Sequence, residues 1–159
     1  MHTETERKFL VLSDAFKAQA VASHRIKQGY IARDSGNSVR VRILDGKGIL
    51  TIKGPSPDDI SRSEWEIEIP LPDAEALLRL CHGGIIDKTR YIVPEEGTLS
   101  GKFFEVDVFY GDNEGLVMAE IELDSPEQPF TKPEWLGEEV TGNRHYYNSY
   151  LSLHPYKEW

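Results

Sequence analysis

The sequence predicts a mainly antiparallel β protein of the α+β class, whose strands close into a barrel with a charged interior and a few helices outside. Three observations support this class. Eight segments alternate in the way typical of strands, only two segments have a strong helical pattern, and nearly every predicted strand carries charges on one face. Consecutive antiparallel strands tend to close, because closure removes the exposed edges of a sheet.

The predicted strands are separated by clear turn signals. They cover residues 3–11, 28–33, 37–44, 48–54, 62–69, 86–93, 103–109 and 117–124. Asp45-Gly-Lys-Gly48 predicts a tight turn, so the third and fourth strands form a hairpin. Pro55 and Pro57 indicate a longer loop before the fifth strand.

Helices are predicted outside the strands. Ser13 is a favourable N-cap for a helix that runs to Lys27. A second helix follows Pro72 and ends at Gly83-Gly84, because glycine is common at helix C-termini. Residues 144–153 are predicted as a C-terminal helix that stops before a proline.

The composition fits one globular domain over residues 1–159, with 39% hydrophobic residues to form a core. The net charge of −9 disfavours a nucleic-acid or membrane-surface binder, since such proteins rely on excess Lys and Arg. Cys81 is the single cysteine, which excludes an intramolecular disulfide and a multi-cysteine metal site. The sequence has no membrane-spanning apolar run and no segment typical of a signal peptide, so we expect a cytoplasmic protein.

The charged faces of the strands are sorted by sign. The basic positions are Lys8, Arg40, Arg42, Lys53, Arg62, Lys88 and Arg90, and the acidic positions are Glu4, Glu6, Glu64, Glu66, Glu68, Glu105, Asp107, Glu120 and Glu122. A solvated sheet face would explain any single strand. The same charge pattern on nearly every predicted strand favours a charged barrel interior.

A charged interior is costly if it only supports the fold, because each buried ion loses its hydration. A binding site explains it better. Lys and Arg donate to phosphate oxygens, and paired carboxylates suit Mg²⁺ or Mn²⁺. A cation that bridges carboxylates and phosphates allows both signs in one cavity, so the residues indicate a metal–polyphosphate site.

The opening segment Glu4-Thr-Glu-Arg-Lys8 is similar to the Glu-x-Glu-x-Lys signature of the CYTH superfamily, the triphosphate tunnel metalloenzymes. The resemblance covers almost the whole chain. It continues through Gln28-Gly-Tyr30, Val39-Arg-Val-Arg42, Leu50-Thr-Ile-Lys-Gly54, Arg62-Ser-Glu-Trp-Glu66, Lys88-Thr-Arg-Tyr91, Glu105-Val-Asp107 and Ala119-Glu-Ile-Glu-Leu123, and it ends with Glu139-Val-Thr141 and Tyr146-Tyr-Asn148. It implies an eight-stranded tunnel, and the chain looks most like short bacterial inorganic triphosphatases.

The resemblance also implies roles for individual residues. The phosphates would be held by Lys8, Arg40, Arg42, Lys53, Arg62, Lys88 and Arg90. Mg²⁺ or Mn²⁺ would be bound by Glu4, Glu6, Glu64, Glu66, Glu120 and Glu122. Lys8 would act as general base with Tyr30 as its partner, although Tyr30 reads equally well as a packed strand tyrosine.

The expected reaction is metal-dependent hydrolysis of inorganic tripolyphosphate to pyrophosphate and phosphate. A thiamine triphosphatase, a class IV adenylyl cyclase and a non-catalytic triphosphate sensor remain as alternatives, and the paired carboxylates argue against the sensor. The expected partner is a small triphosphate, with no nucleic acid and no membrane. The oligomeric state stays open, with a homodimer among the options.

Overall fold

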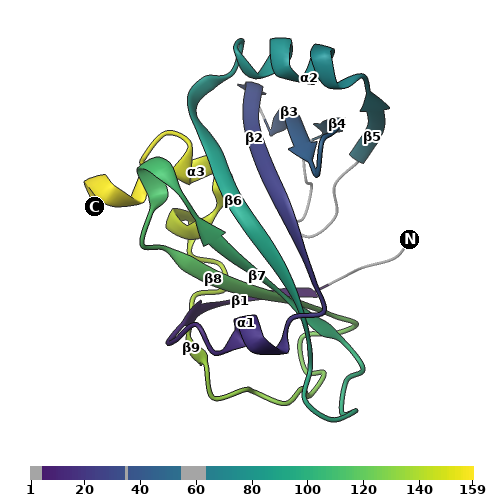
Figure 1. The fold of residues 1–159 in the computed structure, drawn as a ribbon, viewed down its shortest axis with the longest axis vertical. Helices are drawn as coiled ribbons and strands as arrows, with labels where there is room; N and C mark the ends of the chain where they lie inside the picture. Colours follow the sequence, from purple (N-terminus) through teal and green to yellow (C-terminus); the bar gives the residue numbers. More distant parts are fainter. Residues whose placement is uncertain (1–4, 35, 55–63) are drawn as a thin grey trace.

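A computed structural model of the chain describes residues 5–34, 36–54 and 64–159. Its main element is an antiparallel sheet of nine strands in the order β5-β4-β3-β2-β6-β7-β8-β1-β9 (Figure 1). The strands are β1 (Thr5–Val11), β2 (Ala22–Asp34), β3 (Asn37–Leu44), β4 (Lys47–Lys53), β5 (Glu64–Ile69), β6 (His82–Pro94), β7 (Phe103–Phe109), β8 (Val117–Leu123) and β9 (Leu136–Glu139). The predicted fold class is therefore confirmed.

The long strands β2 and β6 run side by side along the molecule and connect its two halves (Figure 1). One half contains β3, β4 and β5, and the other contains β7, β8, β1 and β9. The sheet is not closed by hydrogen bonds, because β5 and β9 form its two edges within the described part of the chain. Strand β9, which pairs with β1, was not predicted.

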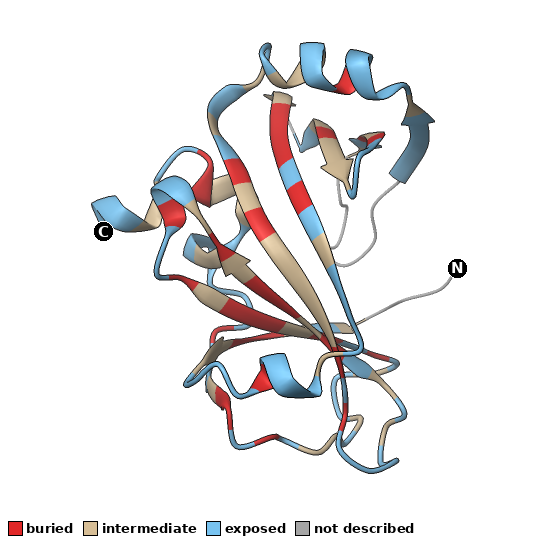
Figure 2. Cartoon of the chain, viewed as in Figure 1, coloured by how far each residue is buried: buried red, intermediate tan, exposed pale blue. Residues whose placement is uncertain are grey.

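Alternation along the strands separates a charged inner face from an apolar outer face. The outer cluster includes Phe9, Phe104 and Ile121, which are buried beneath Phe16 and Trp135. The Trp135 ring meets Phe16 and Phe104 edge to face, at centroid distances of 5.8 and 5.3 Å. Figure 2 shows these buried positions along the strands of this half, whereas β5 is exposed.

A second apolar cluster lies on the inner face. Ile86, Phe109 and Met118 occupy the strand positions next to the inward-facing charges, and Leu151 packs against them. Leu151 belongs to α3 (Asn148–Leu151), so the C-terminal segment covers this part of the interior. The charged part of the interior therefore has an apolar boundary on the side of the C-terminal segment.

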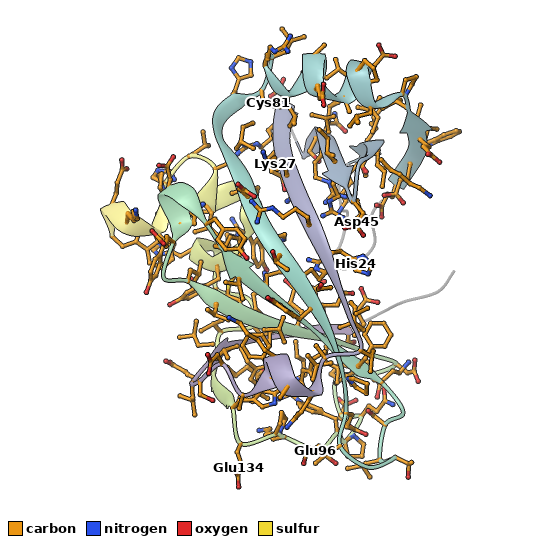
Figure 3. All side chains as sticks on the ribbon, in the orientation of Figure 1. His24, Lys27, Asp45, Cys81, Glu96 and Glu134 are labelled. Carbon is orange, nitrogen blue, oxygen red and sulfur yellow. The ribbon has the colours of Figure 1, made fainter. Side chains whose placement is uncertain are left out.

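The first predicted helix is much shorter than expected. Helix α1 (Phe16–Gln19) is a single turn, and the prediction that it extends to Lys27 is wrong. The segment from Ala22 onward instead begins β2, because it pairs with β6 from Ala22 to Tyr30. His24 consequently lies on a strand, where its ring reaches Asp45 at the β3–β4 turn with an Nδ1–Oδ2 distance of 2.5 Å (Figure 3).

The other helices also end earlier than predicted. Helix α2 (Leu71–Leu78) stops before Gly83-Gly84, which belong to β6, and Cys81 lies between the two elements (Figure 3). The predicted C-terminal helix is divided into a 3₁₀ turn and α3, because Tyr147 has an extended backbone. No helix in the described ranges is long and apolar enough to cross a membrane.

Candidate active site

The inner face of the sheet and the C-terminal segment surround a polar cavity of about 1180 Å³. Its lining comes from seven strands, because alternate side chains of a strand point to the same face of the sheet. The predicted residues that line it are Glu6, Lys8, Tyr30, Arg40, Arg42, Lys53, Arg90, Glu105, Glu120 and Glu122. The structure therefore brings together most of the predicted charges.

Lys8 is fixed by three groups, one on β8 and two in the C-terminal segment. Strand pairing places it opposite Glu120, and its Nζ lies 3.1 Å from Glu120 Oε1. The same Nζ donates a hydrogen bond of 3.2 Å to the Tyr146 carbonyl oxygen and lies 4.8 Å from the centroid of the Tyr147 ring. The ammonium group is thus held at a defined point in the cavity wall.

Arg40 and Arg42 form a basic surface with donors that the protein does not fully use. Arg42 Nε donates to Gln28 Oε1 at 2.7 Å, and Arg40 donates from one terminal nitrogen to Thr51 Oγ1 at 3.3 Å. Arg40 Nε is buried without a hydrogen-bond partner among the described residues. Burial, reinforced by the charges of Arg40 and Arg90, lowers the pKa of Arg42 to about 10. An anion at this surface would satisfy the free donors and relieve the repulsion.

Lys88, Arg90 and Asp107 form a buried ion network beside this surface. Asp107 accepts two hydrogen bonds from Arg90, at 2.8 and 3.0 Å, and one from Lys88 at 2.8 Å. Burial alone would raise the pKa of Asp107, but the charges of Lys88 and Arg90 hold it below its ordinary value. Lys88 also donates to Asn148 Oδ1 at 3.0 Å and is completely buried, so it supports the cavity wall without lining it.

The acidic part of the cavity is formed by β1 and β8. Their register places Glu6 opposite Glu122, and Glu6 also forms a hydrogen bond with Glu120. Burial, reinforced by the charge of Glu120, raises the pKa of Glu6 to about 8. Burial would also raise the pKa of Glu120, but Lys8 holds it below its ordinary value. Two carboxylates that share a proton are a suitable donor set for a divalent cation, which would replace that proton.

The remaining predicted site residues are placed elsewhere. Glu64 and Glu66 lie exposed on the edge strand β5 and are not among the described residues that line the cavity, although Glu66 accepts a hydrogen bond from the Thr51 hydroxyl that Arg40 also contacts. Glu4 and Arg62 lie outside the described residues. In the ranges that the structure describes, no three acidic, histidine or cysteine side chains form a ready-made metal site.

One functional candidate was missed by the sequence analysis. Arg33 lines the cavity, and its guanidinium carbon lies 4.4 Å from the centroid of the Tyr30 ring. Simple alternation places residues 28, 30 and 32 inside and residue 33 outside. The register of β2 against β3 shifts between Tyr30 and Ala32, and this irregularity reverses the alternation. A single sequence carries no clear signal for such a shift.

Almost the whole chain is similar to known proteins. Residues 2–153 match the CYTH domain. An inorganic triphosphatase of Acetivibrio thermocellus is 48% identical over 100% of this chain and 99% of its own length. An inorganic triphosphatase of Nitrosomonas europaea is 36% identical over 95% of this chain and 97% of its own length. The crystal structure of the inorganic triphosphatase NE1496 has a TM-score of 0.75 and 33% identity, and the match covers 96% of each chain.

Proposed function

The chain belongs to the CYTH domain family, and from this membership and the cavity we propose that it hydrolyses inorganic tripolyphosphate to pyrophosphate and phosphate with a divalent cation. The observation that carries the proposal is that one cavity contains both a basic surface and an acidic surface. At the basic surface, Arg40 Nε is buried without a hydrogen-bond partner among the described residues, and at the acidic end Glu6 and Glu120 are hydrogen-bonded to each other.

The basic surface would bind and orient the substrate. Arg40 and Arg42 would hold phosphate oxygens directly, with Lys53 and Arg90 beside them, and Lys88 would support Arg90 through Asp107. Fixed cations around the transferring phosphoryl group neutralise its charge and align it with the attacking water. The role proposed for Arg62 rests on the family resemblance.

The acidic surface would bind the cation. Glu6, Glu120 and Glu122 would hold Mg²⁺ or Mn²⁺, together with Glu4 as the resemblance implies. When bound, the ion would polarise phosphate oxygens and assist the attacking water. The metal-binding role of Glu64 and Glu66 rests on the family resemblance, since they are not among the described residues that line the cavity.

Lys8 and Tyr30 would handle the proton of the attacking water. Water attacks the terminal phosphorus atom, the bond from that phosphorus to the bridging oxygen breaks, and pyrophosphate leaves. In the general-base role that the family resemblance implies, Lys8 would first release its own proton to solvent and then, as a neutral amine, accept the proton of the attacking water, with the Tyr30 hydroxyl beside the same cavity. Both residues line the cavity, and among the described residues Lys8 contacts Glu120, Tyr146 and Tyr147 whereas Tyr30 contacts Arg33.

The cavity favours an inorganic substrate over one with a ring system. Among the described lining residues, the aromatic rings are those of Tyr30 and Tyr147. Each already has a cation against it, Arg33 on Tyr30 at 4.4 Å and Lys8 near Tyr147 at 4.8 Å. A nucleobase or thiamine ring would have to displace a cation before it could stack, which argues against the cyclase and the thiamine triphosphatase.

Phosphate release tests the proposal. Tripolyphosphate, ATP and thiamine triphosphate should be compared in parallel with Mg²⁺, Mn²⁺ or EDTA, and Glu6→Gln serves as the matched variant. We expect release from tripolyphosphate that requires the cation and is largely lost in the variant. Cyclic nucleotide formed from ATP would instead indicate a cyclase. Tight tripolyphosphate binding without turnover would indicate a sensor.

A further inference from the structure

We propose that Arg33 is a positioning residue, which holds the C-terminal segment 146–152 in place so that this segment orients Lys8 and Lys88. The inference rests on the proposed function, because the placement of these lysines matters for catalysis only if the cavity binds a triphosphate. Neither the charge pattern of the strands nor the family resemblance assigned a role to Arg33. The inference comes from its contacts.

Arg33 connects β2 with the C-terminal segment through one guanidinium group. Its Nη1 donates to the Ser149 carbonyl oxygen at 2.7 Å, and its Nη2 donates to Ser152 Oγ at 2.6 Å. The flat face of the same group lies on the ring of Tyr30. A planar guanidinium makes such paired hydrogen bonds in a fixed direction, which a lysine ammonium cannot reproduce.

The segment held by Arg33 contacts both buried lysines of the cavity wall. The Tyr146 carbonyl oxygen accepts from Lys8 Nζ, and the Tyr147 ring lies against the same ammonium group. The Asn148 side chain accepts from Lys88 Nζ at 3.0 Å. Three consecutive residues of the segment therefore set the positions of the two ammonium groups. A displacement of the segment would move them together.

The irregularity in β2 explains why Arg33 reaches the interior. The register pairs Tyr30 with Arg40 and then Ala32 with Val39, so that one residue of β2 is left over. Such a bulge turns the following side chains to the opposite face, and bulges are frequent next to active sites. Without it, Arg33 would point outward and could not reach Ser149 or Ser152.

Arg25 provides a matched control on the same strand. Its guanidinium carbon lies 4.3 Å from the centroid of the Tyr110 ring, and its Nη2 lies 2.6 Å from Asp87 Oδ1. It therefore has the same kind of arginine–tyrosine packing as Arg33, but it does not line the cavity. Arg25→Met and Arg33→Met remove equivalent groups, and only the second cuts the connection to the C-terminal segment.

Steady-state hydrolysis of tripolyphosphate is the first test. Arg33→Met should lower kcat about ten- to a hundred-fold, the size of effect expected when catalytic groups are displaced by about 1 Å, with a much smaller change in KM. Arg33→Lys should recover only part of the loss. Arg25→Met should stay within about twofold of the unmodified protein, and thermal unfolding confirms that each variant is folded. An unchanged kcat in Arg33→Met overturns the inference.

A double variant tests whether Arg33 acts through the segment. If it does, Arg33→Met combined with Asn148→Ala should lose little more activity than Arg33→Met alone, because the segment is already displaced. If the fold-loss in activity of the double variant equals the product of the two single-variant losses, the two residues act independently, and this result would refute the mechanism.

Hydrogen exchange gives a readout that needs no activity. The Gly84 amide donates to the Ser152 carbonyl oxygen at 2.6 Å, so its exchange reports the docking of the segment. It should exchange faster in Arg33→Met than in Arg25→Met, and equal rates would refute the positioning role. If the unmodified protein hydrolyses no triphosphate, the proposed function fails, while the exchange rates still decide whether Arg33 holds the segment.

Discussion

The buried ion network offers the sharpest test of the energetics of the cavity wall. Asp107→Asn keeps the shape of the side chain but removes the one carboxylate among the described residues that contacts both Lys88 and Arg90. Breaking a buried ion pair by removing one partner costs about 3–5 kcal/mol, because the remaining charge is left buried without compensation. Lys88 is 0% exposed, so solvent cannot screen its charge. We therefore expect the free energy of unfolding to fall by about 3–5 kcal/mol near pH 5.5.

The loss should depend on pH because Lys88 can give up its proton. Burial lowers the pKa of Lys88 from 10.5 to about 8, although Asp107 opposes this shift. Without Asp107 the pKa of Lys88 falls further. Where the folded protein has released this proton and the unfolded chain has not, stability rises with pH by up to about 1.4 kcal/mol per unit. This rise begins near pH 8 in the unmodified protein and at lower pH in the variant.

The stability deficit of Asp107→Asn, which is its loss in free energy of unfolding relative to the unmodified protein, should therefore shrink between pH 5.5 and pH 8. Urea unfolding followed by tryptophan fluorescence at pH 5.5, 6.5 and 8 measures it. Glu114→Gln is the control, since it removes an exposed ion pair of 3.5 Å with Lys157 and should change stability by less than about 1 kcal/mol at each pH. A deficit below about 1 kcal/mol at pH 5.5, or one that stays constant up to pH 8, would refute the reasoning.

Three further outcomes follow from the site and its surroundings. Lys8→Ala should reduce kcat for tripolyphosphate far more than it weakens substrate binding measured by calorimetry, and equal losses in both would exclude the general-base role. Mn²⁺ should bind more tightly as pH rises toward 8, because the proton on Glu6 competes with the ion, and calorimetry on Glu6→Gln should show a weaker pH dependence. The hydrogen bonds from Arg7 lower the pKa of Glu139 to about 2, so this pair stabilises the fold fully above about pH 4.5 and less as pH falls toward 2. The guanidinium of Arg7 also lies against the Phe9 and Phe130 rings, a contact that does not depend on pH. Arg7→Ala should therefore cost more at pH 7 than at pH 2, by up to about 1 kcal/mol, and a cost that does not depend on pH would contradict the assignment of the Arg7–Glu139 pair.

Much of the sheet could be predicted because its alternation is local. Arg40 and Arg42 alternate with apolar residues on β3, and the structure turns these arginines inward with Val41 completely buried on the opposite face. The prediction of a helix up to Lys27 is wrong because a long-range strand pairing outweighs the local helical pattern. Phe16 and Ala20 have helical spacing, but the residues that follow pair with β6, and this pairing outweighs the local preference.

The site was less predictable where it depends on irregular backbone. Strand β9 has only four residues and no alternation, and it forms because the free side of β1 is available. The inward direction of Arg33 follows from a register shift, which one sequence does not reveal. The cluster of Glu6, Glu120 and Glu122 was foreseen, whereas the separation of Glu64 and Glu66 from it depends on the sheet staying open at β5.

The exposed edge at β5 has a consequence for aggregation. Trp65 and Ile67 are 73% and 56% exposed on this strand. A strand at the edge of a sheet with exposed apolar side chains can pair with the same strand of a second molecule. Glu64, Glu66 and Glu68 alternate with them, so two such strands in antiparallel contact would place carboxylates opposite one another. This repulsion protects the edge at neutral pH. Acid, or divalent cations in excess of what the cavity binds, would weaken the protection and promote edge-to-edge association of the molecules.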